Sequence, residues 1–250
     1  MQSDLIWENP ASNRSRIASD LEAYSFAKDP DLILLPEMFT TGFTMSPQKV
    51  AEGMNGPTLQ WMHSLAGQYG TALGGSLVIS EGGHYLNRFV LVHPEGRVDH
   101  YDKRHLFALA GEHVPYQPGQ QRKVFELKGW RLMPLICYDL RFPVWSRNDV
   151  NYDLLVYVAN WPKPRHQAWR SLLVARAIEN QAYVLGVNRW GQDNNGLEYM
   201  GGSVVVDYAG ERRLELDKPG IATYTLDRQF MMTFREKLNF LADRDTFSIL

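Results

Sequence analysis

Cysteine is nearly absent from this sequence, since Cys137 is the only one among 250 residues. A single thiol excludes a disulfide within the chain and suits a reducing compartment, so we expect a cytoplasmic protein. Long hydrophobic runs are also absent, and no stretch approaches the ~18 consecutive apolar residues of a membrane span. The first residues have neither a basic region nor a long apolar run, so we expect no secretory signal peptide.

The chain also lacks an excess of charge of either sign. Lysine and arginine total 26 against 28 acidic residues, which gives a net charge of −2. Phosphate binding needs a basic surface, so nucleic acid is not expected as a partner. The seven histidines are scattered, with neither a His-Glu-x-x-His run nor paired cysteines, so no metal site and no metal-dependent hydrolase is expected.

Strand-like and helix-like segments alternate through the whole chain without a linker, a repeat or a low-complexity tract. Helices are predicted to begin at Asn9 and Pro57, and a third over residues 166–180 with Ile178 on its inward face. Strands are predicted at residues 71–79, 85–92, 97–101, 124–127, 131–136, 154–159, 184–188, 203–206 and 221–226. The pattern indicates one α/β domain over residues 1–250, and by itself fits a barrel as well as a sandwich.

What is present begins with Cys137, which ends an apolar run and is followed at once by a polar turn. A strand that presents a thiol at its carboxyl end and then breaks into a turn is typical of a catalytic nucleophile. On its position alone, a lone cysteine is more often a small buried hydrophobe with an inert sulfur. Two other predicted strand ends favour the nucleophile.

Those two strand ends each carry one charged residue. Glu37 follows an apolar run that Pro36 ends, and Lys103 follows a predicted hairpin strand. Each alone is more often a solvated loop residue. Together with Cys137 they supply what acyl transfer needs, namely a thiol, a carboxylate base and a cation for the oxyanion. The backbone N–H of Tyr138, the residue after the thiol, is a second oxyanion donor.

The chain resembles the nitrilase (carbon–nitrogen hydrolase) superfamily in three signature segments, LLPEMF at 34–39, YDKRHLF at 101–107 and ICYDLRFP at 136–143. Four shorter segments extend the likeness: AGEH at 110–113 with Pro118-Gly119, NWP at 160–162, ARAIENQ at 175–181 and GGS at 201–203. Within the superfamily it is most similar to the ω-amidases, which hydrolyse the terminal amide of 2-oxo acid amides such as 2-oxoglutaramate.

The resemblance implies a four-layer α-β-β-α sandwich, with two sheets face to face and helices outside each, and a homodimer. It implies that Glu37 is the base, that Cys137 forms a thioester with the acyl group, and that Lys103 holds the oxyanion. Glu112 would orient Lys103 and the incoming amide or water, although without the resemblance an exposed loop acid is equally expected. No metal or organic cofactor is implied.

The expected substrate is a small amide whose far carboxylate should meet a cation or backbone donors. Arg141 is available, but an arginine in such a turn more often ties Asp139 or loop carbonyls together, and we favour that structural role. Candidate pocket walls, for which a core role is equally expected, are the aromatic residues that flank the catalytic segments: Phe39, Phe43, Tyr138 and Trp161.

Other functions stay open. Another amidase of the superfamily, a carbamoyl hydrolase or a true nitrilase would use the same trio of residues. A non-catalytic binding protein on this fold would more naturally have lost one of the charged positions. A papain-type protease would have a different sequence around its cysteine.

The beginning of the sequence departs from the resemblance. Relatives of this kind usually open with a short apolar strand before the segment that matches residues 2–7, whereas this sequence starts at Met1. We expect the absence of that strand to leave unpaired backbone groups beside it.

Overall fold

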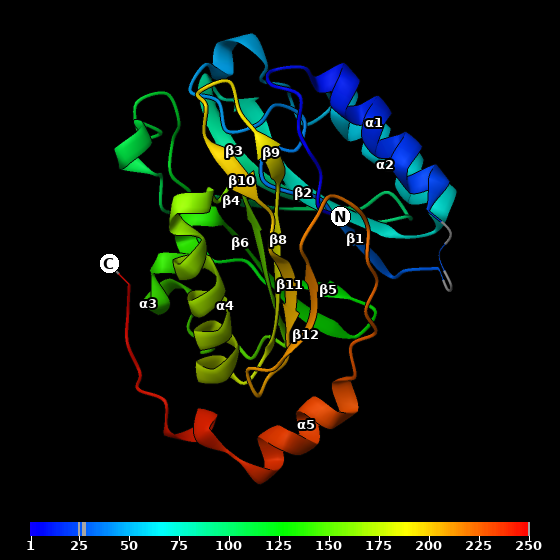
Figure 1. The fold of residues 1–250 in the computed structure, drawn as a ribbon. Coiled ribbons are helices and arrows are strands. Elements are labelled where there is room, and N and C mark those ends of the chain that lie inside the picture. The colour runs from blue at the N-terminus through cyan, green and yellow to red at the C-terminus, as the bar shows by residue number, and fades with distance from the viewer. Residues whose placement is uncertain (25, 27–28, 250) are drawn as a thin grey trace.

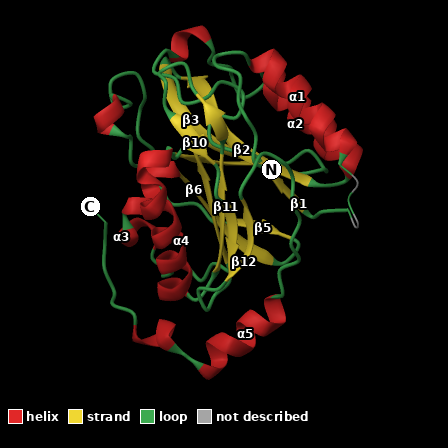
Figure 2. Cartoon of the chain, viewed as in Figure 1, coloured by secondary structure: helices red, strands yellow, loops and turns green. Residues whose placement is uncertain are grey.

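Two β-sheets pack face to face, and helices cover the outer face of each sheet (Figures 1 and 2). This computed structural model describes residues 1–24, 26 and 29–249. The arrangement confirms the predicted four-layer α-β-β-α sandwich. Its central core lies between the sheets, where Leu34 and Leu91 of one sheet meet Leu132 and Val156 of the other.

The first sheet has the order β1-β2-β3-β4, with β1 parallel to β2 and the other pairs antiparallel. Side chains alternate between the two faces of a strand. Ile33 therefore packs under the helices while Leu34 points to the opposite sheet. The strands are β1 (Leu32–Leu34), β2 (Ala72–Glu81), β3 (His84–Val92) and β4 (Val98–Asp102).

The second sheet has the order β12-β11-β8-β7-β6-β5. Strands β6, β7 and β8 are parallel, so their carboxyl ends share one edge of the sheet. The strands are β5 (Phe125–Leu127), β6 (Trp130–Ile136), β7 (Leu154–Ala159), β8 (Tyr183–Asn188), β11 (Ser203–Val206) and β12 (Arg212–Leu216). A separate antiparallel pair is formed by β9 (Trp190–Gln192) and β10 (Glu198–Met200).

The helices lie on the two outer faces (Figure 1). The first sheet is covered by α1 (Pro10–Ala23) and α2 (Pro57–Tyr69), and the second by α4 (His166–Asn180). The side chain of Asn9 caps α1 by accepting the backbone N–H of Ser12 at 3.1 Å. The remaining helices are the short α3 (Pro143–Ser146) and α5 (Arg228–Lys237) near the carboxyl terminus.

Two predictions about secondary structure are wrong. Ile178 is 53% exposed, because the inward stripe of α4 is formed by Trp169, Leu173 and Ala177. Residues 221–226 form no strand, since no neighbouring strand is in register to take their hydrogen bonds. The other predicted strands and the helix over residues 166–180 are confirmed within two residues at each end, and the predicted starts of the two other helices are confirmed within one residue.

The first strand has a free edge. Within the described residues β1 pairs only with β2. The Met1 ammonium donates to the carbonyl of Leu34 at 2.9 Å, and burial lowers the pKa of this ammonium to about 5. A cavity of about 450 Å³ lies beside this edge. It is lined by β1, by strands of the second sheet and by residues 221–226. The Met1 ammonium thus binds one backbone acceptor beside this edge.

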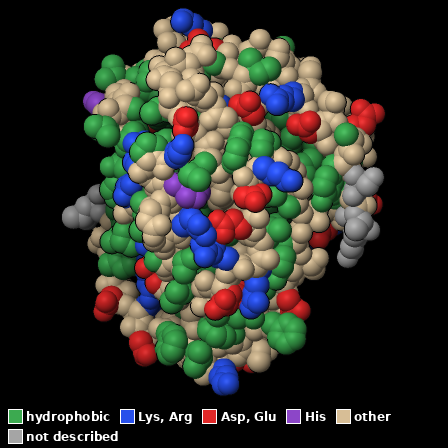
Figure 3. Space-filling model, viewed as in Figure 1, with side chains coloured by type: hydrophobic (Ala, Val, Ile, Leu, Met, Phe, Trp, Pro, Cys, Tyr) green, Lys and Arg blue, Asp and Glu red, His purple; other side chains and the backbone are tan. Residues whose placement is uncertain are grey.

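The surface matches the composition. On the face drawn in Figure 3, acidic and basic side chains are interspersed rather than gathered into a patch of one sign. Among the described residues, no helix combines the length and apolar character needed to cross a membrane.

Candidate active site

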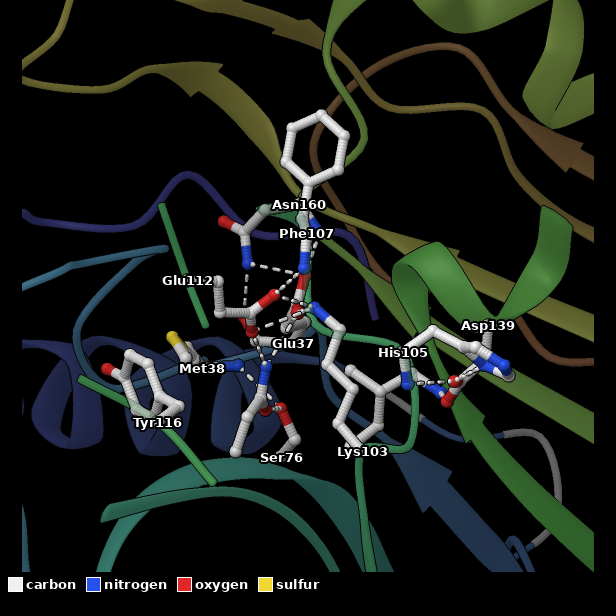
Figure 4. Close-up of polar contacts among 12 residues, drawn as sticks. Glu37, Met38, Ser76, Lys103, His105, Phe107, Glu112, Tyr116, Asp139 and Asn160 are labelled. Atoms are coloured by element: carbon white, nitrogen blue, oxygen red, sulfur yellow. Dashed lines mark hydrogen bonds and ion pairs between the residues drawn. The ribbon is translucent and has the colours of Figure 1, made fainter. Parts of the chain in front are cut away.

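Three strands carry the predicted site residues at their ends, and Figure 4 shows two of these residues, Glu37 and Lys103, in contact. Glu37 follows β1, Lys103 follows β4 and Cys137 follows β6. The side chains of Glu37 and Lys103 are fully buried, and Lys103 Nζ lies 2.9 Å from Glu37 Oε1. Both charges act on the Cys137 thiol. The structure therefore brings together three residues that lie up to a hundred positions apart in the sequence.

Glu112 completes the ionic cluster. Its carboxylate lies on the other side of the same ammonium, with Oε1 at 3.0 Å and Oε2 at 2.9 Å from Lys103 Nζ. The backbone N–H of Phe107 donates to Glu112 Oε2 at 2.6 Å, which holds the loop around the carboxylate. Glu112 is fully buried, so it is not a solvated loop acid.

The cluster shifts the proton affinities of its members. Burial alone would lower the pKa of Lys103, but the carboxylates of Glu112 and Glu37 outweigh burial and raise that pKa, so the ammonium stays charged. Burial raises the pKa of Glu112, and Lys103 opposes this effect. Two carboxylates that share one cation in a buried space thus favour uptake of a proton by Glu112.

Cys137 occupies a strained position. It has φ +46°, in the left-handed region, at the point where β6 ends and a short 3₁₀ helix (Cys137–Arg141) begins. For a residue other than glycine this conformation costs about 1–2 kcal/mol. Burial raises the pKa of the thiol well above its ordinary value, Glu37 raises it further and Lys103 opposes them. The thiol is therefore protonated at neutral pH and needs a base to become a nucleophile.

Asn87, which the sequence analysis missed together with Ser76, bridges the two carboxylates. Asn87 Nδ2 donates to Glu37 Oε1 at 2.8 Å and to Glu112 Oε1 at 3.1 Å. Ser76 Oγ donates to Asn87 Oδ1 at 2.9 Å, which fixes the orientation of the amide. Both residues lie within long strands, β2 and β3, that carry other polar residues as well, so the sequence does not single them out.

Asn160 holds Glu37 from the opposite sheet. Its backbone N–H donates to Glu37 Oε2 at 2.8 Å, and its Nδ2 donates to the Glu37 carbonyl at 2.6 Å. Asn160 Oδ1 is buried and has no partner among the described residues. The Glu37 carboxylate therefore has donors on both oxygens, and the free acceptor of Asn160 lies nearby.

The carbon–nitrogen hydrolase family matches residues 7–236, which include all of these side chains. This chain belongs to the carbon–nitrogen hydrolase family. It is a hydrolase that acts on carbon–nitrogen bonds other than peptide bonds.

Individual relatives agree with the family. The hydrolase is 44% identical to "Omega-amidase YafV" of Yersinia enterocolitica over its whole length and 97% of that protein. It is 33% identical to "2-oxoglutaramate amidase" of Bacillus subtilis, with 95% of this chain and 93% of that one covered. The crystal structure of XC1258 from Xanthomonas campestris, a CN-hydrolase superfamily protein with an arsenic adduct in its active site, superimposes with a TM-score of 0.95. It is 40% identical and the match covers 100% of this hydrolase and 97% of that chain.

The predicted aromatic walls divide into two groups. Phe39 is fully buried in the core under α1 and α2, with its ring 6.1 Å from that of Trp61, so its prediction as a pocket wall is wrong. The turn over residues 37–41, in which Met38 has φ +44°, places Phe39 on the helix side. Phe43 is half-buried at the site, with Lys103 Nζ 5.1 Å from the centre of its ring. The Tyr138 ring, also half-buried, packs edge-on at 5.0 Å from that of Phe107.

Arg141 does not have the structural role that the sequence favoured. Asp139 takes its hydrogen bonds from other groups, and within the described chain the Arg141 side chain has neither a hydrogen bond nor an ion pair. Its guanidinium instead lies 5.0 Å above the ring of Trp161. A second guanidinium, that of Arg165, lies 5.0 Å above the ring of Phe107, and the sequence analysis did not single it out. Two cations therefore rest on aromatic rings close to the catalytic segments.

Over residues 1–24, 26 and 29–249, no group of three or more histidine, cysteine, aspartate or glutamate side chains is arranged to hold a metal ion.

Proposed function

We propose that this hydrolase is an ω-amidase, which converts a 2-oxo acid amide such as 2-oxoglutaramate to the 2-oxo acid and ammonia. One observation carries the proposal: a fully buried cluster of Glu37, Lys103 and Glu112 acts on a strained thiol at Cys137. The similarity to an omega-amidase along the whole chain, and to a 2-oxoglutaramate amidase, supports the substrate class. Residues 1–250 would form one catalytic domain.

The first half of the reaction is acylation. Glu37 takes the thiol proton as Sγ of Cys137 attacks the amide carbon. The negative charge that develops on oxygen is held by Lys103 Nζ and the Tyr138 N–H. Protonated Glu37 then gives its proton to the amide nitrogen, the carbon–nitrogen bond breaks, and ammonia leaves a thioester on Cys137.

The second half is deacylation. Glu37, again a carboxylate, takes a proton from water as the oxygen attacks the thioester. The carbon–sulfur bond breaks, the 2-oxo acid leaves and the proton returns to the thiol. Glu112 orients Lys103 through both carboxylate oxygens and, with its raised pKa, also orients the incoming amide or water.

Recognition of the substrate carboxylate falls to Arg141. Its guanidinium has no carboxylate partner in the described chain and lies over the ring of Trp161, so it is free to pair with an anion. Phe43 and Tyr138 are the proposed walls for the short carbon chain between the amide and the carboxylate.

A cytoplasmic homodimer is the proposed working form. The lone cysteine suits a reducing compartment. Val144 on α3 and Ile178 on α4 are 54% and 53% exposed on the outside of the second sheet, where a second copy would cover them. A mass in solution of twice 28.7 kDa would support the dimer, and a mass of one chain would contradict it.

The test is ammonia release from 2-oxoglutaramate by the wild-type protein beside Cys137→Ala. We expect turnover by the wild type and a loss of roughly 10⁴-fold or more in the variant. Glutamine and an N-carbamoyl amino acid serve as competing substrates. A wild type that prefers either of them would contradict the ω-amidase assignment, and an active Cys137→Ala would contradict the nucleophile.

A further inference from the structure

Asp139, two residues after Cys137, has a fully buried carboxylate with two donors on each oxygen (Figure 4). Oδ2 accepts the Ile136 N–H at 3.0 Å and the Tyr101 hydroxyl at 2.8 Å. Oδ1 accepts the His105 N–H at 3.0 Å and lies 2.7 Å from His105 Nδ1. In the part of the chain that the structure describes, His105 is the only basic side chain within ion-pair distance of this carboxylate.

These donors come from two segments that both serve the site. Ile136 immediately precedes Cys137, so the bond from its N–H to Asp139 spans the strained residue from one side to the other. His105 lies two residues after Lys103, so the same carboxylate also holds the segment that carries the cation. One side chain therefore ties the turn of the thiol to the segment of the ammonium.

The groups around Asp139 are themselves oriented. Trp145 Nε1 donates to the Tyr101 hydroxyl at 2.9 Å, which leaves the Tyr101 proton for Asp139. The His105 ring stacks on Phe142 with centres 3.7 Å apart. An ionised carboxylate only accepts hydrogen bonds, so His105 carries its proton on Nδ1. The donors are thus fixed before any substrate binds.

A contribution to the stability of the fold does not by itself explain the hydrogen bonds around Asp139. A buried carboxylate loses its hydration, and apolar side chains of similar volume often stabilise such a site as well or better. We propose that Asp139 is a positioning residue, which fixes the Cys137 turn against the Lys103 segment so that the thiol, the Tyr138 N–H and the ammonium converge on one carbonyl. The proposal rests on the proposed amidase function and adds to it a residue that does not touch the substrate.

The test is Asp139→Asn. An amide of the same shape has one acceptor oxygen in place of two, so either the Ile136 and Tyr101 donors or the His105 donors lose their partner. We expect kcat to fall about 100-fold with KM changed less than about 3-fold, because a misplacement of ~1 Å has that effect. A kcat within about 3-fold of the wild-type value would overturn the proposal.

Asp153→Asn is the matched control. Asp153 is also a buried carboxylate with several donors, namely Arg228 Nε, Arg235 Nη1 and the Arg131 N–H at 3.1, 3.1 and 3.2 Å, but it has no contact with the site. We expect this variant to lower the melting temperature and to leave kcat within about 2-fold of the wild type. Equal losses of kcat in both variants would mean that general destabilisation explains the effect, and would overturn the positioning role.

The pH dependence of Cys137 alkylation by iodoacetamide separates positioning from ionisation. The charges that shift the pKa of the thiol include those of Glu37, Lys103 and Glu112. We therefore expect the same alkylation midpoint in Asp139→Asn as in the wild type while kcat falls. A shifted midpoint that accounts for the lost turnover would overturn the proposal.

His105→Ala is a second test of the proposal, for use if Asp139→Asn does not fold. It removes the half-buried ring from Asp139 Oδ1 and leaves the bonds from the backbone N–H groups of Ile136 and residue 105. We expect a fall of about 10-fold in kcat, and an unchanged kcat would overturn the part of the proposal that assigns the His105 ring to the link between the two segments. A wild type that hydrolyses only other amides would contradict the proposed substrate and not this inference, since the variants are compared on whichever amide is turned over.

Discussion

Two buried ionic clusters in this protein have opposite composition. At the site, one ammonium, that of Lys103, serves the two carboxylates of Glu37 and Glu112, and all three side chains are fully buried. Near the carboxyl terminus, one carboxylate, that of Asp153, serves the two guanidiniums of Arg228 and Arg235. There the Arg228 side chain is 45% exposed, so solvent screens part of the charge.

The difference shows what identifies an active site. The Asp153 cluster borders a hollow of about 840 Å³ whose lining includes two residues with positive φ, Asn151 and Gln181, yet it holds no thiol. The Lys103 cluster has an excess of buried negative charge, a raised pKa at Glu112 and a thiol in a left-handed turn beside it. Like charges forced together next to a nucleophile are costly for stability and useful for proton transfer. The size of a hollow carries no such information.

The largest expected effect on turnover comes from removal of the cation in the Lys103 cluster. Lys103→Met removes an oxyanion donor, so we expect turnover to fall at least ~1,000-fold. The fold should persist, because a carboxylate left without its cation can take up a proton. Ammonia release and a thermal melt measure both properties. A folded variant with a near-normal rate would remove Lys103 from the oxyanion site.

The next effect concerns the base. Glu37→Gln keeps the shape of the side chain but cannot accept the thiol proton, so we expect both acylation and deacylation to slow by about 100- to 10,000-fold. Rapid mixing with the amide should show no burst of ammonia. A burst equal to the enzyme concentration would show that another group deprotonates Cys137.

Arg235→Met makes the corresponding change in the other cluster. The Arg235 side chain is 13% exposed and bonds to Asp153, the Gln181 carbonyl and the Tyr152 carbonyl. We expect the free energy of unfolding to fall by about 2–4 kcal/mol, because Asp153 keeps only a partly exposed partner. Turnover by the folded variant should stay within about 2-fold of the wild type, as measured beside a urea titration. Lost turnover without lost stability would contradict a purely structural Asp153 cluster.

The smallest effect is a shift in the titration of the thiol. Negative charge and a hydrogen-bond acceptor at Glu37 raise the pKa of Cys137, so Glu37→Gln should move the alkylation midpoint to lower pH. In the wild type, the midpoint should lie above that of an ordinary thiol. Mass spectrometry of iodoacetamide labelling measures this without background, since the chain has one cysteine. A midpoint that rises in the variant would contradict the geometry of the cluster.

Much of the fold could be predicted because its signals are local. The apolar runs that became β1, β6 and β7 are continuous in the sequence, and the polar residues that end them are the ones that reach the site. The predictions failed where the structure depends on contacts with a segment that is distant in the sequence. Residues 221–226 have an apolar pattern but no adjacent strand, and Ile178 depends on which stripe of α4 meets the sheet.

The site could be predicted only in part, because only some of its residues leave a local signal in the sequence. Glu37, Lys103 and Cys137 could be found as strand ends, and Glu112 through a resemblance of its surroundings. Their supports include Asn87 on β3, Asn160 after β7 and Asp139 in the same short helix as Cys137, and they act through hydrogen bonds that no local sequence pattern indicates. Phe39 was assigned to the wrong side because its face depends on how the chain leaves β1.

The sequence by itself determined where the strands end and which reactive groups stand at those ends, because apolar runs, prolines and turns act over a few residues. Only the tertiary structure decided which of these groups share one buried space. The ammonium of Lys103 meets a carboxylate 66 residues away, and the same carboxylate accepts the N–H of a residue 123 positions further on. Proton affinity depends on burial and on charges within a few ångströms, so the chemistry of the thiol is a property of the packed sheets.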